Sequence, residues 1–339
     1  MESSTVEEVA QRVEELTSRL ASLRAEIAKR VVGQQDAVAE VLLCLLTGGH
    51  GLLEGVPGLA KTMLVRTLAD ALDLEFRRIQ FTPDLMPGDI TGTEVIEEDR
   101  STGRRTTRFL RGPVFTQVLL ADEINRAPPK TQAALLEAMQ ERHVTAGGEL
   151  LELPAPFFVL ATQNPIEQEG TYPLPEAQLD RFMLKISLDY PGGRDEVEVL
   201  RTTTGDEPEA VTAVLSGPEI LHLQRLVRGV AVSDAMLEYT ALLVRSSRPG
   251  REEAVEITNR WVRWGAGPRA GQSLILCAKA HALMNGRFHV HPDDLARVAP
   301  AVLRHRILLN FQAEAEGRTP DEVVSALLAE VEAPKSGVL

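Results

Sequence analysis

The sequence predicts an α/β fold, in which a core of parallel strands and helices precedes a domain built from helices alone. Three observations support this prediction. A glycine-rich loop at 55–60 lies between an apolar strand and a helix, two later apolar strands end in polar residues at 122–123 and at 164, and helical periodicity dominates from about residue 194 onward. Apolar strands with polar tips are typical of parallel sheets, which place ligands at the carboxyl ends of their strands.

The glycine-rich loop has the composition of a phosphate-binding loop. Its residues are Gly55, Val56, Pro57, Gly58, Leu59, Ala60, Lys61, Thr62 and Met63. Backbone N–H groups of such a loop converge on a phosphate at a helix N-terminus, where the dipole favours an anion. Lys61 would then reach the β- and γ-phosphates of ATP, and the Thr62 hydroxyl would ligate Mg²⁺. Ala60 replaces the usual last glycine; the alternative reading is a Gly/Pro turn before an ordinary helix.

Polar residues follow the next two apolar strands. Asp122 and Glu123 form a carboxylate pair, which is costly beyond an apolar strand unless it acts on a cation or a water. Asp122 would hold Mg²⁺ through its shell, and Glu123 would orient and deprotonate the attacking water. Asn164 can donate and accept, which suits positioning a water against a γ-phosphate. The alternatives are an N-cap acid for the first pair and an Asx turn before Pro165 for Asn164.

Composition and charge limit the classes of function. The 339 residues are 44% hydrophobic, 25% charged and 4% aromatic, as in ordinary globular proteins of roughly two domains. The net charge of −13 argues against non-specific binding to nucleic acid or to an anionic membrane. The N-terminus lacks the basic and apolar regions of a signal peptide, and no run approaches the ~18 apolar residues of a membrane span. We therefore expect a cytoplasmic protein with no membrane insertion, in which Cys44 and Cys277 are reduced core residues.

The chain divides into an N-terminal helix (1–30), an α/β core (31–191) and a helical domain (192–339). The boundary near 192 follows from the Tyr190-Pro-Gly-Gly punctuation and the change in composition after it. The N-terminal helix carries a heptad seam at Val6, Val9, Val13, Leu16, Leu20, Leu23 and Ile27. This seam would either pair with another chain or pack on its own domain or a neighbour's. The next segment, which contains Val32, would be placed to cover an adenine.

Two hairpins are expected within the core. The first spans 93–112, and the second spans 143–153 around a Gly-Gly turn. The far side of the first hairpin carries Arg104, Arg105, Arg108 and Arg111, a basic group in an acidic protein. These arginines would form either a solvated face or a loop that grips a partner.

Taken together, these stretches resemble the MoxR branch of the AAA+ ATPases, in the helix-2-insert clade, over essentially residues 30–330. The resemblance rests on ordered motifs: Walker A at 55–62, Walker B at 119–127, sensor 1 at 161–165, the arginine-finger segment at 174–182 and sensor 2 at 267–270. Ala60, which is unusual in a general phosphate loop, is usual in this branch.

The resemblance implies a three-layer αβα core with a five-stranded parallel sheet, an all-α lid, and a homo-oligomeric ring, commonly a hexamer, with ATP between subunits. Arg181 would act on the neighbour's γ-phosphate, unless it merely pairs with Asp180 or Glu176. Arg269 would contact the nucleotide from the lid, in cis or in trans. The two hairpins would match the helix-2 insert and the pre-sensor-1 hairpin, which face the ring axis or a partner.

The function implied is ATP hydrolysis coupled to the remodelling or maturation of client proteins, often ones with a von Willebrand factor A domain. One rival is a nucleic-acid motor, because helicases of the minichromosome-maintenance type share the clade. The acidic net charge disfavours that rival, whereas the arginines of the first hairpin favour it. A second rival is a non-hydrolysing scaffold, which the intact set of Lys61, Asp122, Glu123, Asn164 and Arg181 argues against.

Overall fold

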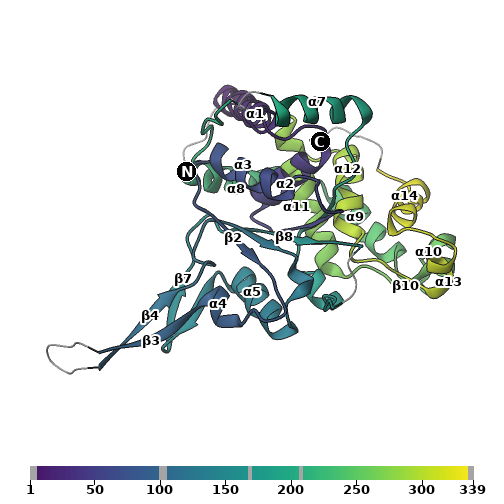
Figure 1. Ribbon diagram of the computed structural model, residues 1–339. Helices are drawn as coiled ribbons and strands as arrows, with labels where there is room; N and C mark the ends of the chain where they lie inside the picture. The colour runs from purple at the N-terminus through teal and green to yellow at the C-terminus, as the bar shows by residue number, and fades with distance from the viewer. Residues whose placement is uncertain (1–5, 99–104, 167–169, 206–208, 335–339) are drawn as a thin grey trace.

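The computed structural model describes residues 6–98, 105–166, 170–205 and 209–334, and its core is a parallel five-stranded sheet (Figure 1). The strand order is β2-β5-β8-β1-β9. The strands are β1 (Gly51–Glu54), β2 (Phe76–Gln80), β5 (Val118–Asp122), β8 (Phe158–Gln163) and β9 (Leu184–Ser187). Every pairing between them is parallel, so all their carboxyl ends meet at one edge.

The sheet is covered on both faces, which makes the core three-layered. Successive residues of its strands enter different hydrophobic clusters: Leu53 and Leu120 belong to one cluster, whereas Leu52 and Leu119 belong to the other. All five residues of β5 are buried. Central strands of a parallel sheet are apolar throughout because helices cover both of their faces. The three-layer core with a five-stranded parallel sheet is therefore confirmed.

Helices of the first half pack on either side of this sheet. They are α1 (Val6–Ala28), α2 (Gln35–Thr47), α3 (Lys61–Ala71), α4 (Pro87–Thr91), the 3₁₀ turn η1 (Ile124–Arg126), α5 (Pro129–Glu141) and α6 (Glu176–Leu179). Leu20, Leu23 and Ile27 of α1 are buried in the same cluster as α2 and α3. This part of the heptad seam packs on its own chain and is not free to pair with another.

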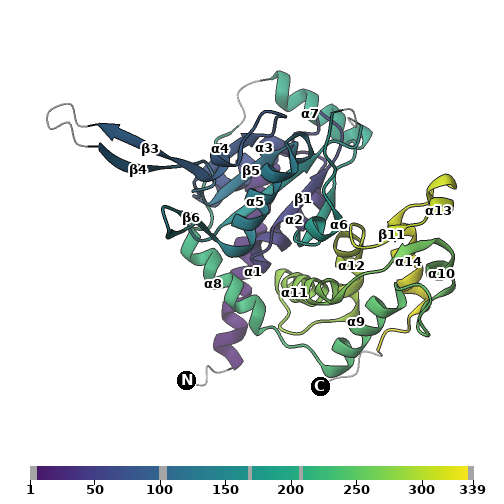
Figure 2. The same cartoon turned by 90° about the horizontal axis from the view of Figure 1, so that it is seen from below.

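Both expected hairpins are antiparallel, and the longer one projects from the body (Figures 1 and 2). They are β3 (Gly92–Glu98) with β4 (Arg105–Arg111), and β6 (His143–Ala146) with β7 (Glu149–Glu152). Arg104 lies outside the described residues. Arg105 lies 3.6 Å from Glu98, and Arg108 lies 3.3 Å from Glu97. The long hairpin therefore carries mixed charge and not a purely basic face.

The second half is mainly helical. Its elements are α7 (Gly193–Thr204), α8 (Gly217–Gly229), α9 (Asp234–Ser246), α10 (Glu256–Trp261), β10 (Val262–Trp264), α11 (Pro268–Met284), α12 (Pro292–Leu303), β11 (Leu308–Leu309), α13 (Phe311–Ala315) and α14 (Pro320–Glu330). The short antiparallel pair of β10 and β11 departs from the expectation of helices alone. Strands this short carry no readable alternation. Within the described residues, no helix combines the length and apolar character needed to cross a bilayer.

A buried carboxylate lies where α2 meets α12. Glu40 of α2 is 8% exposed, and its carboxylate lies 3.7 Å from the Arg297 guanidinium of α12. Burial raises the pKa of Glu40 from an ordinary 4.5 to about 7, although Arg304 and Arg297 oppose this rise. Between pH 4.5 and pH 7, Glu40 is therefore protonated in the folded chain but ionised in the unfolded chain.

Because the pKa of Glu40 is higher in the folded state, the proton on Glu40 adds to the free energy of unfolding. This contribution is complete below pH 4.5 and is lost as the pH rises through 7. The loss corresponds to roughly 3 kcal/mol. We expect Glu40→Gln to remove this pH dependence, so that the variant gains stability relative to wild type as the pH rises. Urea unfolding of both chains between pH 5 and pH 8 measures it, with the exposed Glu330→Gln as control. A constant difference across this range would contradict the assignment.

Candidate nucleotide-binding site

The loop between β1 and α3 has the close packing and special backbone angles of a phosphate loop. A Cβ at Gly55 would lie 2.8 Å from the Leu188 Cβ and 2.9 Å from the Leu188 carbonyl oxygen, so only glycine fits there. Gly58 has φ +87°, and Ala60 has φ 54° in the left-handed region. A left-handed alanine costs roughly 1–2 kcal/mol. Such strain is typical of loops whose shape serves a ligand.

Helix α3 begins at Lys61 without a cap. No side chain caps it, and the described residues offer no hydrogen-bond acceptor for the N–H groups of Lys61, Thr62 and Met63. Half-buried Thr62 and exposed Met63 lie on this first turn. Val56, Pro57 and Leu59 complete the loop around these donors. Free N–H groups at the positive end of a helix dipole fit an anion such as a phosphate.

The Lys61 ammonium is already directed back over the loop. It donates a hydrogen bond to the Gly55 carbonyl oxygen at 2.5 Å. Burial lowers the pKa of Lys61, whereas the carboxylates of Asp122, Glu123 and Glu54 raise it. The structure therefore brings Lys61 together with both predicted carboxylates.

Asp122 ends β5 at the same edge and is 8% exposed. Its Oδ1 accepts a hydrogen bond from the Thr162 hydroxyl at 2.6 Å, and its Oδ2 accepts from the Arg78 guanidinium at 2.6 and 3.0 Å. A carboxylate offers about four acceptor sites, so one remains for a water. Hydroxyl and carboxylate oxygens are the ligands that Mg²⁺ prefers. Thr62 and Asp122 therefore fit this ion as a donor set.

Glu123 lies half-buried beside Asp122, at the N-cap position of η1. Its φ is 56°, and its side chain makes no capping hydrogen bond to η1. The carboxylate accepts hydrogen bonds from the Gln80 amide at 2.8 Å and from the Arg126 guanidinium at 2.9 Å, both on Oε2. The Glu123 backbone N–H donates to the Thr162 hydroxyl at 2.8 Å. One carboxylate oxygen is thereby fixed in place, and the other has no hydrogen-bond donor among the described residues.

Asn164 follows β8 and lines a cavity of about 420 Å³. Its side-chain oxygen accepts a hydrogen bond from the Ile166 N–H at 3.1 Å, which is the Asx turn that the sequence allowed. Its Nδ2 is buried without a partner among the described residues. A buried amide donor left unpaired costs about 1–3 kcal/mol. It is therefore available to a ligand or a water.

The segment with Val32 also lies near this edge. Gly33 packs against Pro191 and Asp195, where an added Cβ would meet side-chain atoms at 2.9 Å. The Gln34 amide donates a hydrogen bond to the Asp189 carbonyl oxygen at 2.8 Å. Residues 189–195 follow Leu188, which covers Gly55. The neighbours of Val32 along the chain therefore pack on the residues that follow Leu188, which contacts Gly55 of the loop.

Arg181 lies at the opposite edge of the sheet. Leu184 pairs with Gly51 in the parallel register of β9 and β1, so Arg181 precedes the strand starts, whereas the loop follows their ends. Strands rise about 3.3 Å per residue, which separates Arg181 from its own phosphate loop by more than the length of β1. Arg181 is exposed, and among the described residues no carboxylate lies within ion-pair distance of its guanidinium. The alternative of pairing with Asp180 or Glu176 is not observed.

Asp180 instead binds two arginines from the helical half. The Arg306 guanidinium donates to Asp180 Oδ1 at 2.7 Å, and Arg269, at the start of α11, lies 3.6 Å from Asp180 Oδ2. Arg269 is exposed. Arg269 therefore shares a surface with Arg181 and is not gathered with Lys61, Asp122 and Glu123.

Comparison with known proteins agrees with this geometry. The ATPase family associated with various cellular activities (AAA) matches residues 50–184, and the AAA lid domain matches residues 255–327. Chaperone MoxR1 of Mycobacterium tuberculosis is 44% identical over 310 residues, which are 91% of this chain and 81% of that protein. The chain belongs to the MoxR family of AAA ATPases.

Other relatives align along nearly the whole chain. Protein MoxR of Methylorubrum extorquens is 31% identical and covers 93% of this chain and 95% of its own. YeaC of Bacillus subtilis, an uncharacterised protein, is 41% identical, and the alignment covers 95% of this chain and 97% of YeaC. A crystal structure from Cytophaga hutchinsonii superposes with a TM-score of 0.89 at 42% identity, covering 97% of this chain and 99% of the other.

Sequence reasoning missed several residues that hold the MoxR site together. Arg78 and Gln80 of β2 bind Asp122 and Glu123, and the Thr162 hydroxyl of β8 links the Asp122 carboxylate to the Glu123 backbone N–H. Their signal was weak, because polar residues on an alternating strand usually face solvent. Arg306 was missed entirely, since its partner Asp180 lies 126 residues away.

Proposed function

We propose that the chain hydrolyses ATP to ADP and phosphate, with Mg²⁺, at sites completed between the subunits of a homo-oligomeric ring, commonly a hexamer. The proposal rests on one observation. Lys61, Asp122, Glu123 and the free N–H groups of α3 gather at one edge of the sheet, whereas Arg181 lies at the other. A chain that carries the two halves of a site on opposite edges completes it only with a neighbour.

Within one chain, each residue has a distinct role. The N–H groups of the loop and of α3 bind the phosphates, and Lys61 releases the Gly55 carbonyl to bind the β- and γ-phosphates. Thr62, and Asp122 through the metal's shell, would hold Mg²⁺, which would neutralise charge on the phosphate oxygens. Glu123 uses its unbonded carboxylate oxygen to orient and deprotonate the attacking water. Asn164 donates from its free amide to the same water or to the γ-phosphate.

Arg181 and Arg269 act on the nucleotide of the neighbouring subunit. Both are exposed, and both flank Asp180 at the edge remote from their own loop. Their positive charge stabilises the charge that develops on the γ-phosphate during hydrolysis. The ion pair with Asp180 favours the trans assignment for Arg269 over the cis one.

This ATPase cycle drives the remodelling of a client protein in the cytoplasm. Its support is the name of the relative Chaperone MoxR1 and the projecting hairpin of β3 and β4, which offers a surface outside the ATPase core (Figure 1). A von Willebrand factor A domain is the client domain that the family resemblance favours. A nucleic-acid motor is disfavoured, because the net charge is −13 and two of the three described hairpin arginines, Arg105 and Arg108, pair with glutamates.

We expect Glu123→Gln to bind ATP as wild type does but to lose hydrolysis by about 100-fold or more, because the carboxylate acts on water and not on the phosphates. Nucleotide affinity is measured by fluorescence titration and turnover by phosphate release. Glu137→Gln, an exposed change on α5, should leave both unchanged. A collapse of nucleotide affinity in Glu123→Gln would show that its role is misassigned.

We expect Arg181→Ala to keep nucleotide affinity and oligomer size while slowing turnover by about 10³-fold or more, the usual range for an arginine finger. Arg251→Ala, an exposed change distant in sequence from the site motifs, is the matched control. Steady-state turnover in assembled samples measures the effect. Wild-type rates in Arg181→Ala would place the finger elsewhere.

A further inference from the structure

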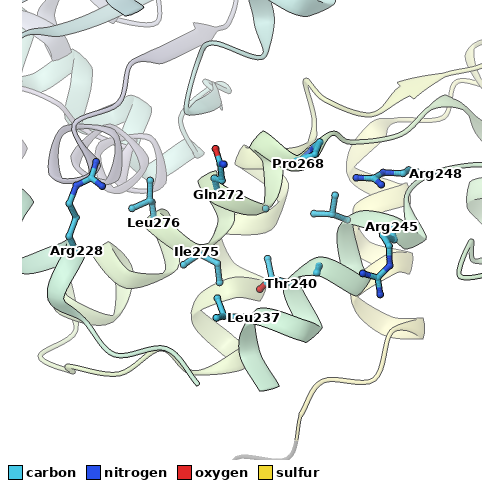
Figure 3. Close-up of a pocket in the computed structure, with 12 residues that line it drawn as sticks. Arg228, Leu237, Thr240, Arg245, Arg248, Pro268, Gln272, Ile275 and Leu276 are labelled. Carbon is cyan, nitrogen blue, oxygen red and sulfur yellow. The ribbon is translucent and has the colours of Figure 1, made fainter. Parts of the chain in front are cut away.

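A groove of about 790 Å³ runs between α9 and α11 of the helical domain (Figure 3). Its floor includes the apolar side chains of Leu237, Ile275 and Leu276. The charged residues that line it are all arginines: Arg228 at one end, and Arg245 and Arg248 at the other. The groove thus offers an apolar floor between two positive ends, in a chain whose net charge is −13.

These arginines are only partly neutralised. Arg245 lies 2.9 Å from Glu253, and Arg248 donates from Nε to the Ala266 carbonyl oxygen at 2.9 Å. Within the described residues, no carboxylate lies within ion-pair distance of Arg228 or Arg248. The complementary occupant is an amphipathic helix with apolar anchors one turn apart and an acidic flank.

Helix α7 of the same chain has this chemistry, and its apolar side chains are exposed. None of its residues is buried. Val197 and Leu200, spaced i and i+3 on one face, are 54% and 62% exposed. Glu196 lies one turn before Leu200 on that face and is exposed. Figure 2 shows α7 well apart from α9 and α11, so α7 does not fill the groove of its own chain.

Both surfaces adjoin a half of the nucleotide site. Pro268 and Gly271, which line the groove, flank Arg269 on the first turns of α11. The first turn of α7 packs on Gly33 through Asp195, shortly after Leu188, which contacts Gly55 of the phosphate loop. When the Arg269 surface of one subunit meets the phosphate-loop edge of the next, the groove and the neighbour's α7 lie at the same interface.

We propose that the groove between α9 and α11 of each subunit receives helix α7 of the adjacent subunit. Val197 and Leu200 contact the apolar floor, and Glu196 faces the arginines. The inference rests on the proposed ring and names the surfaces that close it. Because groove and helix are different parts of one chain, the contact is head-to-tail and repeats around a closed ring.

Disulfide trapping between singly substituted chains tests the contact. Val197→Cys and Ile275→Cys are mixed with ATP and Mg²⁺ under mild oxidation; the native Cys44 and Cys277 are buried and do not compete. A disulfide forms only when the Cα atoms approach within about 7 Å. We expect a covalent dimer in the mixture but not in either variant alone. Ser325→Cys, exposed on α14, replaces Val197→Cys in the control mixture and should give no dimer.

The mass of the same samples in solution separates the two proposals. Rings without the Val197–Ile275 cross-link would overturn the α7 contact and leave the ring intact. A chain that stays monomeric with ATP would overturn both.

Two variants of opposite charge at Leu200 test the contact by a second route. Leu200→Arg should raise the concentration for half-assembly about tenfold or more over Leu200→Glu, since it places a like charge against the arginines. Circular dichroism verifies that both variants are folded. Equal assembly of the two variants would count against the contact.

Discussion

The buried guanidinium of Arg306 is the interaction on which the arrangement of the two halves depends. It is 6% exposed and donates hydrogen bonds to the Asp180 carboxylate at 2.7 Å and to the Phe182 carbonyl oxygen at 2.7 Å. The adjacent His305 contacts the same carbonyl through Nε2 at 3.2 Å. A buried charge that loses its partner costs about 3–5 kcal/mol. The residues that follow α12 are therefore attached to the segment that carries Arg181.

This attachment links the two halves of the proposed shared site within one chain. The phosphate loop, Asp122 and Glu123 lie at the carboxyl edge of the sheet, and Arg181 lies at the amino edge, next to Asp180, which binds Arg306 of the lid. Glu40 and Arg297 join the lid to α2, which begins shortly after Val32 and Gly33. In the proposed ring, these contacts would connect the nucleotide of one subunit, through its own lid, to the arginine that serves the next subunit.

The sequence was sufficient for the fold class and for the local motifs, because these depend on short-range patterns. The loop, the start of α3 at Lys61 and the carboxylates after β5 follow from glycine positions and from apolar runs with polar tips. It was not sufficient for contacts between distant residues. Arg78 reaches Asp122 across 44 positions, and the partner of Asp180 is Arg306 and not the adjacent Arg181. No spacing rule encodes such pairs, since they form only when the sheet and the lid are assembled.

The most direct measurement of the central claim is ATPase rate against protein concentration, with wild type mixed with an excess of an Arg181→Ala/Lys61→Ala double variant. The account predicts that specific activity rises with concentration and that the inert subunit suppresses it, because each wild-type phosphate site then faces a neighbour without its arginine. A turnover that is independent of concentration and unchanged by mixing would mean that one chain holds a complete site. That result would contradict the division of the site between the two edges of the sheet.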